Sequence, residues 1–136
     1  MVHIDITYEG GLRTRAVHGP SGTELITDAP TDNQGKGESF SPTDLLATSV
    51  GSCMLTIMGI VAERHEWDMQ GATARVVKSM AADPKRRVSQ VSIDITVPGN
   101  FDDKARTALE RAALTCPVHT TLGDNVELPV TFHWGS

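Results

Sequence analysis

The sequence lacks the features that mark a nucleic-acid-binding or secreted protein. Its 136 residues include 12 basic and 17 acidic side chains, which give a formal net charge of -5 without any block of like charges. Because phosphate binding needs a basic surface, this balance argues against nucleic acid as a partner. The first residues show no basic region followed by an apolar stretch, so we expect no secretory signal and a cytoplasmic location.

Cysteine is scarce, and the patterns of metal and nucleotide sites are missing. The chain has two cysteines, Cys53 and Cys116, which stay reduced in the cytoplasm unless they do redox work. The histidines show no metal-ligand spacing with them. The loop at Gly35–Gly37 lacks the Gly-Lys-Ser/Thr ending of a phosphate-binding loop. We therefore expect no metal and no cofactor.

One apolar run is long enough to raise the question of a membrane. Residues 45–62 have no charged side chain, and this length is close to the minimum for a spanning helix. The run contains Thr48, Ser52 and Thr56, however, and it lacks flanking aromatic anchors. A helix that is apolar on nearly all sides is also typical of the centre of a globular fold. We expect such a central helix and no membrane contact.

The N-terminal half predicts three strands and one helix. Alternating residues within 3–27 are divided by glycine turns at Gly10–Gly11 and near Gly22, which is typical of short antiparallel strands. A polar, glycine-rich loop follows. Ser41 and Asp44 then form a capping box around a proline suited to the first helical position, so we expect a helix from there to about residues 64–66.

The C-terminal half predicts a hairpin, a second helix and a last strand. Residues 72–80 and 88–97 alternate between apolar and polar and flank a turn. The second helix is expected from about residues 100–103 to Cys116, where Pro117 ends it. Residues 126–134 are expected to form the final strand. The prediction is a single α+β domain over residues 1–136, with the order βββ-α-ββ-α-β.

The central helix also predicts an oligomer. A helix with almost no polar face needs cover on all sides. One sheet and one other helix cover it poorly. We therefore expect antiparallel sheets wrapped around central helices in an interwound homodimer.

Both cysteines fall on predicted helices. Cys53 lies about three turns into the first helix, on a stripe with Leu46, Val50 and Ile57. Cys116 is expected on the last turn of the second. Taken alone, each could be a small buried hydrophobe, because free cysteine is among the most buried residue types.

The surroundings of the cysteines resemble those of a known family. Residues 41–53, read as S-P-T-D-L-L followed by six residues and Cys53, resemble the S-P-x-E-L-L-x-x-x-x-x-x-C helix of the OsmC/Ohr proteins. Residues 114–118 resemble that family's second Cys-Pro site. The order of elements matches as well, so the resemblance covers essentially the whole chain. Because Thr43 stands where the dedicated reductases have a glutamate, the fit is better with the broader OsmC-like branch.

The resemblance implies a thiol-dependent peroxidase for oxidative-stress defence. Cys53 would attack the distal oxygen of an organic hydroperoxide and become a sulfenic acid. Cys116 would resolve it as a disulfide, which an external dithiol would reduce. Only a thiolate attacks, and burial raises the pKa of a thiol, so the reactive cysteine needs a nearby cation.

The resemblance places an arginine of the N-terminal hairpin over the reactive thiol. Arg13 and Arg15 are both candidates on one face of the strand, and we favour Arg13 because it lies nearer the glycine turn. Both could instead be ordinary solvated residues. In the hydroperoxide reductases a glutamate directly after the helix-starting proline holds the arginine, but this chain has Thr43 there. Asp44, expected as a helix cap, and Glu38 are the possible substitutes.

The resemblance also implies a site at the dimer interface, lined by residues of both chains. The lining residues expected from this chain are Phe40, Leu45, Leu46 and Met54. Such a lining would favour organic hydroperoxides, because an alkyl tail gains free energy on burial.

Two other functions stay open at this stage. Thr43 favours a non-catalytic OsmC-like stress protein that binds a small apolar ligand. A Cys-His hydrolase that pairs Cys116 with His119 is the third possibility, although no orienting third group is apparent.

Overall fold

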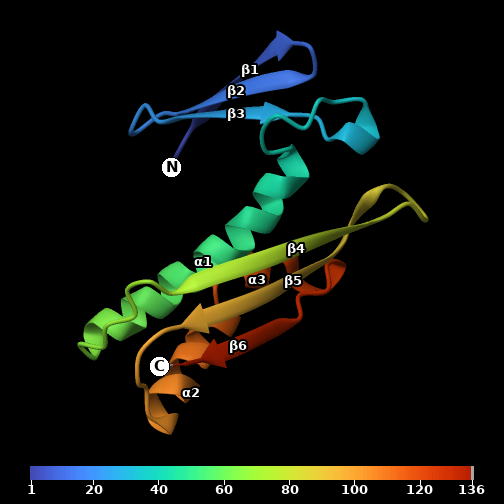
Figure 1. The fold of residues 1–136 in the computed structure, drawn as a ribbon. Coiled ribbons are helices and arrows are strands. Elements are labelled where there is room, and N and C mark those ends of the chain that lie inside the picture. Colours follow the sequence, from blue (N-terminus) through green and yellow to red (C-terminus); the bar gives the residue numbers. More distant parts are fainter. Residues whose placement is uncertain (136) are drawn as a thin grey trace. The chain divides into compact units, whose positions relative to one another are not determined.

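The computed structural model describes residues 1–135, and the chain divides into two compact units, Met1–Leu46 and Ala47–Ser136. Figure 1 shows the helices and strands. In chain order they are β1 (Ile4–Gly10), β2 (Arg13–His18), β3 (Glu24–Asp28), η1 (Thr31–Asn33), α1 (Pro42–Arg64), β4 (Thr73–Ala81), β5 (Arg87–Val97), α2 (Asp103–Leu114), α3 (Pro117–Leu122), η2 (Gly123–Asn125) and β6 (Val130–Trp134). The α+β class and the order of the larger elements are as predicted.

The N-terminal unit is built on an antiparallel sheet of order β1-β2-β3. The β1–β2 turn uses Gly10, Gly11 and Leu12, all at positive φ (83°, 63° and 66°). Glycine reaches this region without steric cost, which explains the pair at the turn. The turn starts β2 at Arg13, whose register partner on β3 is Asp28.

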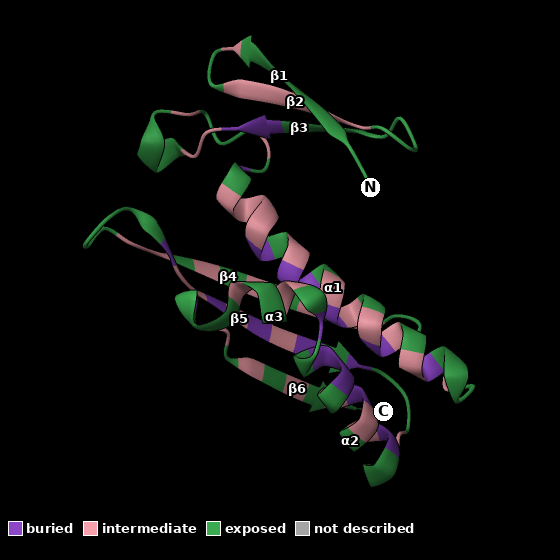
Figure 2. Ribbon diagram, turned by 180° about the vertical axis from the view of Figure 1, so that it is seen from behind, coloured by how far each residue is buried: buried purple, intermediate pink, exposed green. Residues whose placement is uncertain are grey.

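One face of this sheet is apolar and uncovered in the single chain. Ile4, Ile6 and Tyr8 alternate along β1 and share a face with Leu25 of β3, as the strand registers show. The exposed fractions of these four side chains lie between 51% and 66%, and Figure 2 shows β1 as exposed. Three strands become stable when such a face is packed against something. This face is therefore a surface that needs a partner.

The helix α1 begins where the capping box predicted. The amide of Asp44 donates to Ser41 Oγ (3.1 Å), and the amide of Ser41 donates to Asp44 Oδ2 (2.9 Å). One stripe of α1 is buried, and its members are Ala47, Val50, Gly51, Met54, Met58 and Ala62. Gly51 permits close packing, because a Cβ placed there would lie 3.0 Å from Val76 Cγ1 on β4.

Within residues 1–135, α1 is the one helix long and apolar enough to span a membrane by length and composition. The core helix of a globular protein passes the same test. The buried stripe and the contact of Gly51 with β4 are what a core helix requires. The opposite face shows Thr48, Ser52 and Thr56 to solvent, a polar row that is not typical of a lipid-facing surface.

The C-terminal unit is a sheet of order β4-β5-β6 with its helices on one face (Figures 1 and 2). Along β5 the residues that point toward the helices are buried, while their neighbours are not. The core of this unit includes Val91, Ile93, Ile95 and Val97 from β5 and Leu109 and Ala113 from α2.

Three details differ from the sequence-based expectations. The second helix ends at Leu114, and Cys116 begins a further helix, α3, with Pro117 at its first position. Proline ends a preceding helix but suits the first turn of a new one. The strand β6 is parallel to β5, because α2 and α3 form a crossover between them. It starts at Val130, directly after Pro129, which lacks an N–H group.

Candidate functional site

The two cysteines interact within the C-terminal unit, and both are free thiols. Cys53 lies in the middle of α1 and is partly exposed, whereas Cys116 is fully buried. The fold therefore brings together two residues that are distant in sequence. It leaves one cysteine partly exposed and shields the other.

Cys116 is the N-cap residue of α3, and its Sγ accepts a hydrogen bond from the backbone N–H of His119 (3.3 Å). Burial is the largest cause that raises the pKa of Cys116 above its ordinary value. The His119 amide opposes this shift, and the thiol of Cys53 adds to the increase. Cys116 is thus held as a neutral thiol, which can donate a proton toward Cys53.

His119 contributes its amide to Cys116. In a Cys-His hydrolase the imidazole ring accepts the proton of the thiol. Here the contact runs from the backbone N–H of His119 to Cys116 Sγ instead. The contact that exists here supports a structural role for His119 at the start of α3.

The two candidate arginines have separate carboxylate partners in the N-terminal unit. Arg13 Nη2 lies 2.5 Å from Glu38 Oε1 and 3.6 Å from Asp28 Oδ2. Arg15 pairs with Glu24 at 2.8 Å and with Glu9 at 3.5 Å. Glu38, one of the two predicted substitutes for the missing glutamate, is therefore a partner of Arg13. The other, Asp44, is occupied as the cap of α1.

Asp28 was not predicted from the sequence, although a signal was present. It lies directly opposite Arg13 in the β2–β3 register. A hairpin centred between Pro20 and Ser21, in the middle of the turn formed by residues 19–22, would have given that pairing. The side chain of Asp28 is 1% exposed and accepts the backbone N–H of Glu38 at 3.0 Å. This hydrogen bond is the largest cause that lowers its pKa, and the charge of Arg13 lowers it further against the effect of burial.

The residues expected to line a substrate pocket have different degrees of exposure. Phe40 is half exposed, Leu45 and Leu46 are half-buried, and Met54 is completely buried in the stripe of α1. Their assignment to a pocket stays a prediction.

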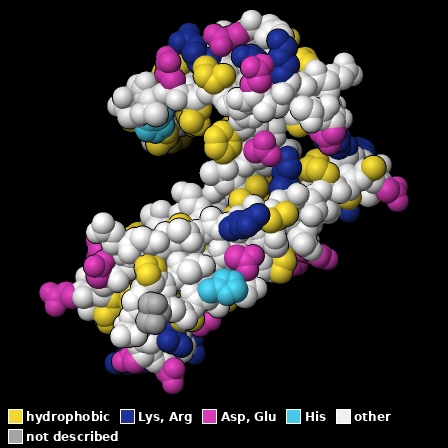
Figure 3. Space-filling view, viewed as in Figure 1, with side chains coloured by type: hydrophobic (Ala, Val, Ile, Leu, Met, Phe, Trp, Pro, Cys, Tyr) yellow, Lys and Arg dark blue, Asp and Glu magenta, His cyan; other side chains and the backbone are white. Residues whose placement is uncertain are grey.

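Charges of both signs are mixed on the surface. On the face drawn in Figure 3, Lys and Arg side chains lie beside Asp and Glu side chains, and no large patch has a single sign. In the N-terminal unit the ion pairs of Arg13 and Arg15 account for part of this mixing.

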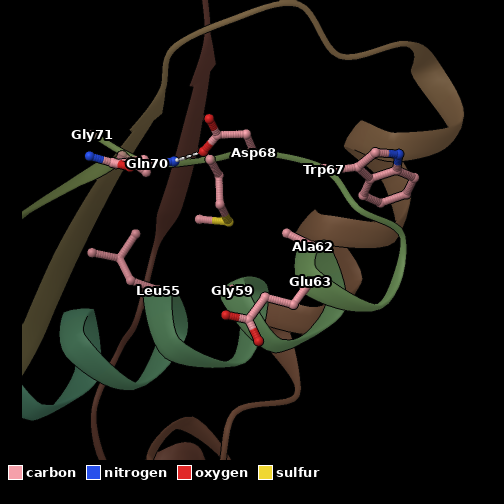
Figure 4. Close-up of a pocket in the computed structure, with 10 residues that line it drawn as sticks. Leu55, Gly59, Ala62, Glu63, Trp67, Asp68, Gln70 and Gly71 are labelled. Carbon is pink, nitrogen blue, oxygen red and sulfur yellow. Dashed lines mark hydrogen bonds between the residues drawn. The ribbon is translucent and has the colours of Figure 1, made fainter.

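An open cavity of about 430 Å³ lies between α1 and the segment that leads to β4. Figure 4 shows Leu55, Gly59 and Glu63 on its helix side and Trp67 and Asp68 on the other. Neither cysteine is among its described lining residues. The cavity is therefore a second concave feature, apart from the thiol pair.

This fold and its sequence are similar to those of known proteins. The structure is of the α+β class, and its longest helix, α1, carries the partly exposed Cys53. The family model of OsmC-like proteins matches residues 35–131. A crystal structure from Psychrobacter arcticus, provisionally described as an osmotic stress induced and detoxification response protein, is 55% identical. The match covers 98% of this chain and 96% of that one, with a TM-score of 0.92. The chain belongs to the OsmC-like family.

More distant similarities come from one solved structure and one sequence. An organic hydroperoxide resistance protein OsmC from Legionella pneumophila is 16% identical, with a TM-score of 0.78 over 98% of this chain and 96% of that one. An uncharacterized protein of Acinetobacter baylyi is 22% identical over 120 residues, which cover 88% of this chain and 84% of that one. At 16% identity the likeness to the Legionella pneumophila structure shows a shared fold.

Proposed function

We propose that this protein is a thiol peroxidase that reduces organic hydroperoxides in oxidative-stress defence. The observation that supports this most strongly is the pairing of an accessible Cys53 with a buried, protonated Cys116. A peroxide would react at the partly exposed Cys53, and the buried Cys116, which interacts with it, would react with the product. Some structural neighbours are named organic hydroperoxide resistance proteins.

The proposed catalytic cycle has three reactants, which are the protein thiols, an organic hydroperoxide (ROOH) and an external dithiol. The Cys53 thiolate attacks the distal oxygen of ROOH, so that an S–O bond forms, the O–O bond breaks and RO⁻ leaves as ROH after protonation. The Cys53 sulfenic acid then reacts with Cys116; an S–S bond forms and water leaves. An external dithiol reduces this disulfide by exchange, becomes oxidised and restores both thiols.

Arg13 is the thiolate-stabilising cation in this proposal, and Arg15 is the alternative. A positive charge beside a thiol favours its ionised form. Arg13 is supported because its carboxylate partners fix its guanidinium at the start of β2.

The proposed working form is a homodimer. Each chain would contribute a single domain that contains both of its units. Proteins of this family are commonly homodimers. The uncovered face of β1–β3, with Ile4, Ile6 and Tyr8, needs an apolar partner. A second copy would supply that cover, and it would complete the pocket predicted around Phe40, Leu45, Leu46 and Met54. The proposed location is the cytoplasm, where dithiol reductants are available.

Thiol titration tests the redox cycle directly. One equivalent of cumene hydroperoxide should remove both free thiols of the wild type and release one equivalent of alcohol. Cys53→Ser should keep Cys116 titratable, and Cys116→Ser should form a sulfenic acid that dimedone traps. Persistence of both wild-type thiols would refute the peroxidase proposal.

Substrate preference tests the apolar lining. We expect faster oxidation of Cys53 by cumene hydroperoxide than by hydrogen peroxide, because the aromatic tail gains free energy on burial. Equal rates would contradict the predicted lining and leave the redox chemistry intact. Phe40→Ala should reduce the preference.

The cavity beside Trp67 favours one alternative, a non-catalytic protein that binds a small apolar ligand. Leu55, Ala62, Trp67 and Met69 supply apolar contacts there without either cysteine. Binding of an apolar fluorophore by Cys53→Ser, abolished by Trp67→Ala, together with inert wild-type thiols, would favour this function over the peroxidase.

A further inference from the structure

Asp28 is the most constrained ionised group in the N-terminal unit. Its side chain is 1% exposed, whereas the side chain of Glu38 is 58% exposed. The N–H of Glu38 donates to Asp28 Oδ2 at 3.0 Å, and the amides of Ala29 and Lys36 also stabilise its negative charge. A buried carboxylate surrounded by backbone N–H groups has a fixed position and stays ionised at neutral pH.

The loop after β3 is folded closely around this carboxylate. The amide of Asp28 donates to the carbonyl of Phe40 at 3.0 Å, and the amide of Gly37 donates to the carbonyl of Ala29 at 3.2 Å. A Cβ on Gly35 would lie 1.7 Å from the carbonyl oxygen of Ala29, so only glycine fits there. The loop geometry therefore depends on contacts next to Asp28.

Both contacts of Arg13 depend on Asp28. Its guanidinium lies 3.6 Å from Asp28 Oδ2, and its hydrogen-bond partner Glu38 is itself attached to Asp28 through the backbone. The second oxygen of Asp28, Oδ1, is buried without a hydrogen-bond partner among residues 1–135. Buried polar atoms are normally satisfied, and the exceptions often occur at functional sites.

We propose that Asp28 is a positioning residue that fixes the Arg13 guanidinium, directly and through Glu38, in the orientation that stabilises the Cys53 thiolate. This inference rests on the proposed function, because it assigns Arg13 its role there. It identifies a buried strand residue as the anchor of the arginine in a chain with Thr43 after the helix-starting proline.

The direction of the effect separates positioning from simple charge. If Asp28 acted only through its negative charge, its removal would make the surroundings more positive and favour the thiolate. If Asp28 holds Arg13 in place, its removal would displace the cation and disfavour the thiolate. The two roles therefore predict opposite changes in the reactivity of Cys53.

The test is the pH dependence of Cys53 alkylation by iodoacetamide, measured in the full chain with Cys116→Ser as background. Asp28→Asn should move the midpoint of the pH–rate profile upward by about one unit and slow alkylation at neutral pH roughly tenfold. Arg13→Ala should have at least the same effect. Asp5→Asn, an exposed acid of the same unit, is the matched control and should leave the profile unchanged.

The outcomes separate the inference from the proposed function. An effect of Arg13→Ala with an unchanged or lowered midpoint for Asp28→Asn overturns the positioning role and leaves the function standing. No effect of Arg13→Ala overturns the role of this arginine and the inference together. Peroxide-driven thiol loss is measured separately, so it reports on the function by itself.

A second pair of variants keeps the test valid if circular dichroism shows that Asp28→Asn does not fold. Arg13→Lys retains the charge but lacks the planar fork that spans two carboxylates. Positioning predicts that Arg13→Lys alkylates almost as slowly as Arg13→Ala. Full recovery of the wild-type profile by lysine would show that charge alone is sufficient, and the inference would be wrong.

Discussion

The two compact units of this chain differ in what stabilises them. In Ala47–Ser136 the sheet and helices enclose a dense apolar core, with residues such as Ile95 and Leu109 fully buried. In Met1–Leu46 nearly every residue of β1 is exposed, and the most deeply buried side chains include Asp28 and Ser41. The C-terminal unit thus has a hydrophobic centre, whereas the N-terminal unit is organised by hydrogen bonds and ion pairs around Arg13.

In the proposed peroxidase the two units would contribute different groups. The thiol pair lies in the unit with the packed core, where burial keeps Cys116 protonated. The arginine lies in the unit whose apolar face needs a partner.

The largest expected effect is on the packed unit. Leu109→Ala removes a fully buried side chain of α2, and we expect it to lower the free energy of unfolding by about 2–5 kcal/mol. Leu114→Ala, at the 45% exposed end of the same helix, should cost less than about 0.5 kcal/mol. Urea unfolding followed by circular dichroism measures both. Equal losses would contradict the contrast between the two sites.

The next effect concerns the uncovered sheet face. Ile6→Asp places a charge on the apolar face of β1, and we expect it to weaken dimerisation roughly 100-fold, because a symmetric dimer loses the burial twice. Thr7→Asp changes the neighbouring residue, which points to the opposite face, and is the matched control. Sedimentation velocity across a concentration series distinguishes them. A wild type that stays monomeric at high concentration would eliminate the proposed dimer.

The sequence predicted local elements better than it predicted how distant elements pair. Alternation in β5 and the capping box of α1 are local patterns, and both appear where expected. The parallel pairing of β6 depends on the crossover through α2 and α3, which no local pattern specifies. Pro117 alone does not fix the position of Cys116, because a proline can follow the end of one helix or occupy the first position of the next, as it does in α3.

The partners of Arg13 were only half predictable. Glu38 was a candidate because an acid in the adjacent loop can reach an arginine on the hairpin. The role of Asp28 depends on the β2–β3 register and on how the loop amides fold over the carboxylate. Those features come from tertiary structure, which periodicity does not report.

Acid should affect the N-terminal unit selectively. The pKa of Asp28 is lower in the folded chain than its ordinary value of 3.8, so its ionised form stabilises the fold. This contribution is present above about pH 3.8 and is lost as the pH falls through the lower, folded value. Stability should therefore decrease more steeply below pH 4 in the wild type than in Asp28→Asn. If the free energy of unfolding fell equally with pH in the two proteins, the pKa of Asp28 would not be lowered by folding.

Alkali should have the smallest effect, and it should act on the C-terminal unit. The pKa of Cys116 is higher in the folded chain than its ordinary value of 9.0, first because of burial and then because of Cys53. A raised folded value contributes stability below pH 9 that is lost as the pH rises through it. Under reducing conditions the wild type should therefore lose more stability above pH 9 than Cys116→Ala. In Cys53→Ser the loss should be smaller but still present, because burial remains. If Cys53→Ser removed it completely, the interaction between the thiols would be the dominant cause, and the shielding of Cys116 by the packed core would be secondary.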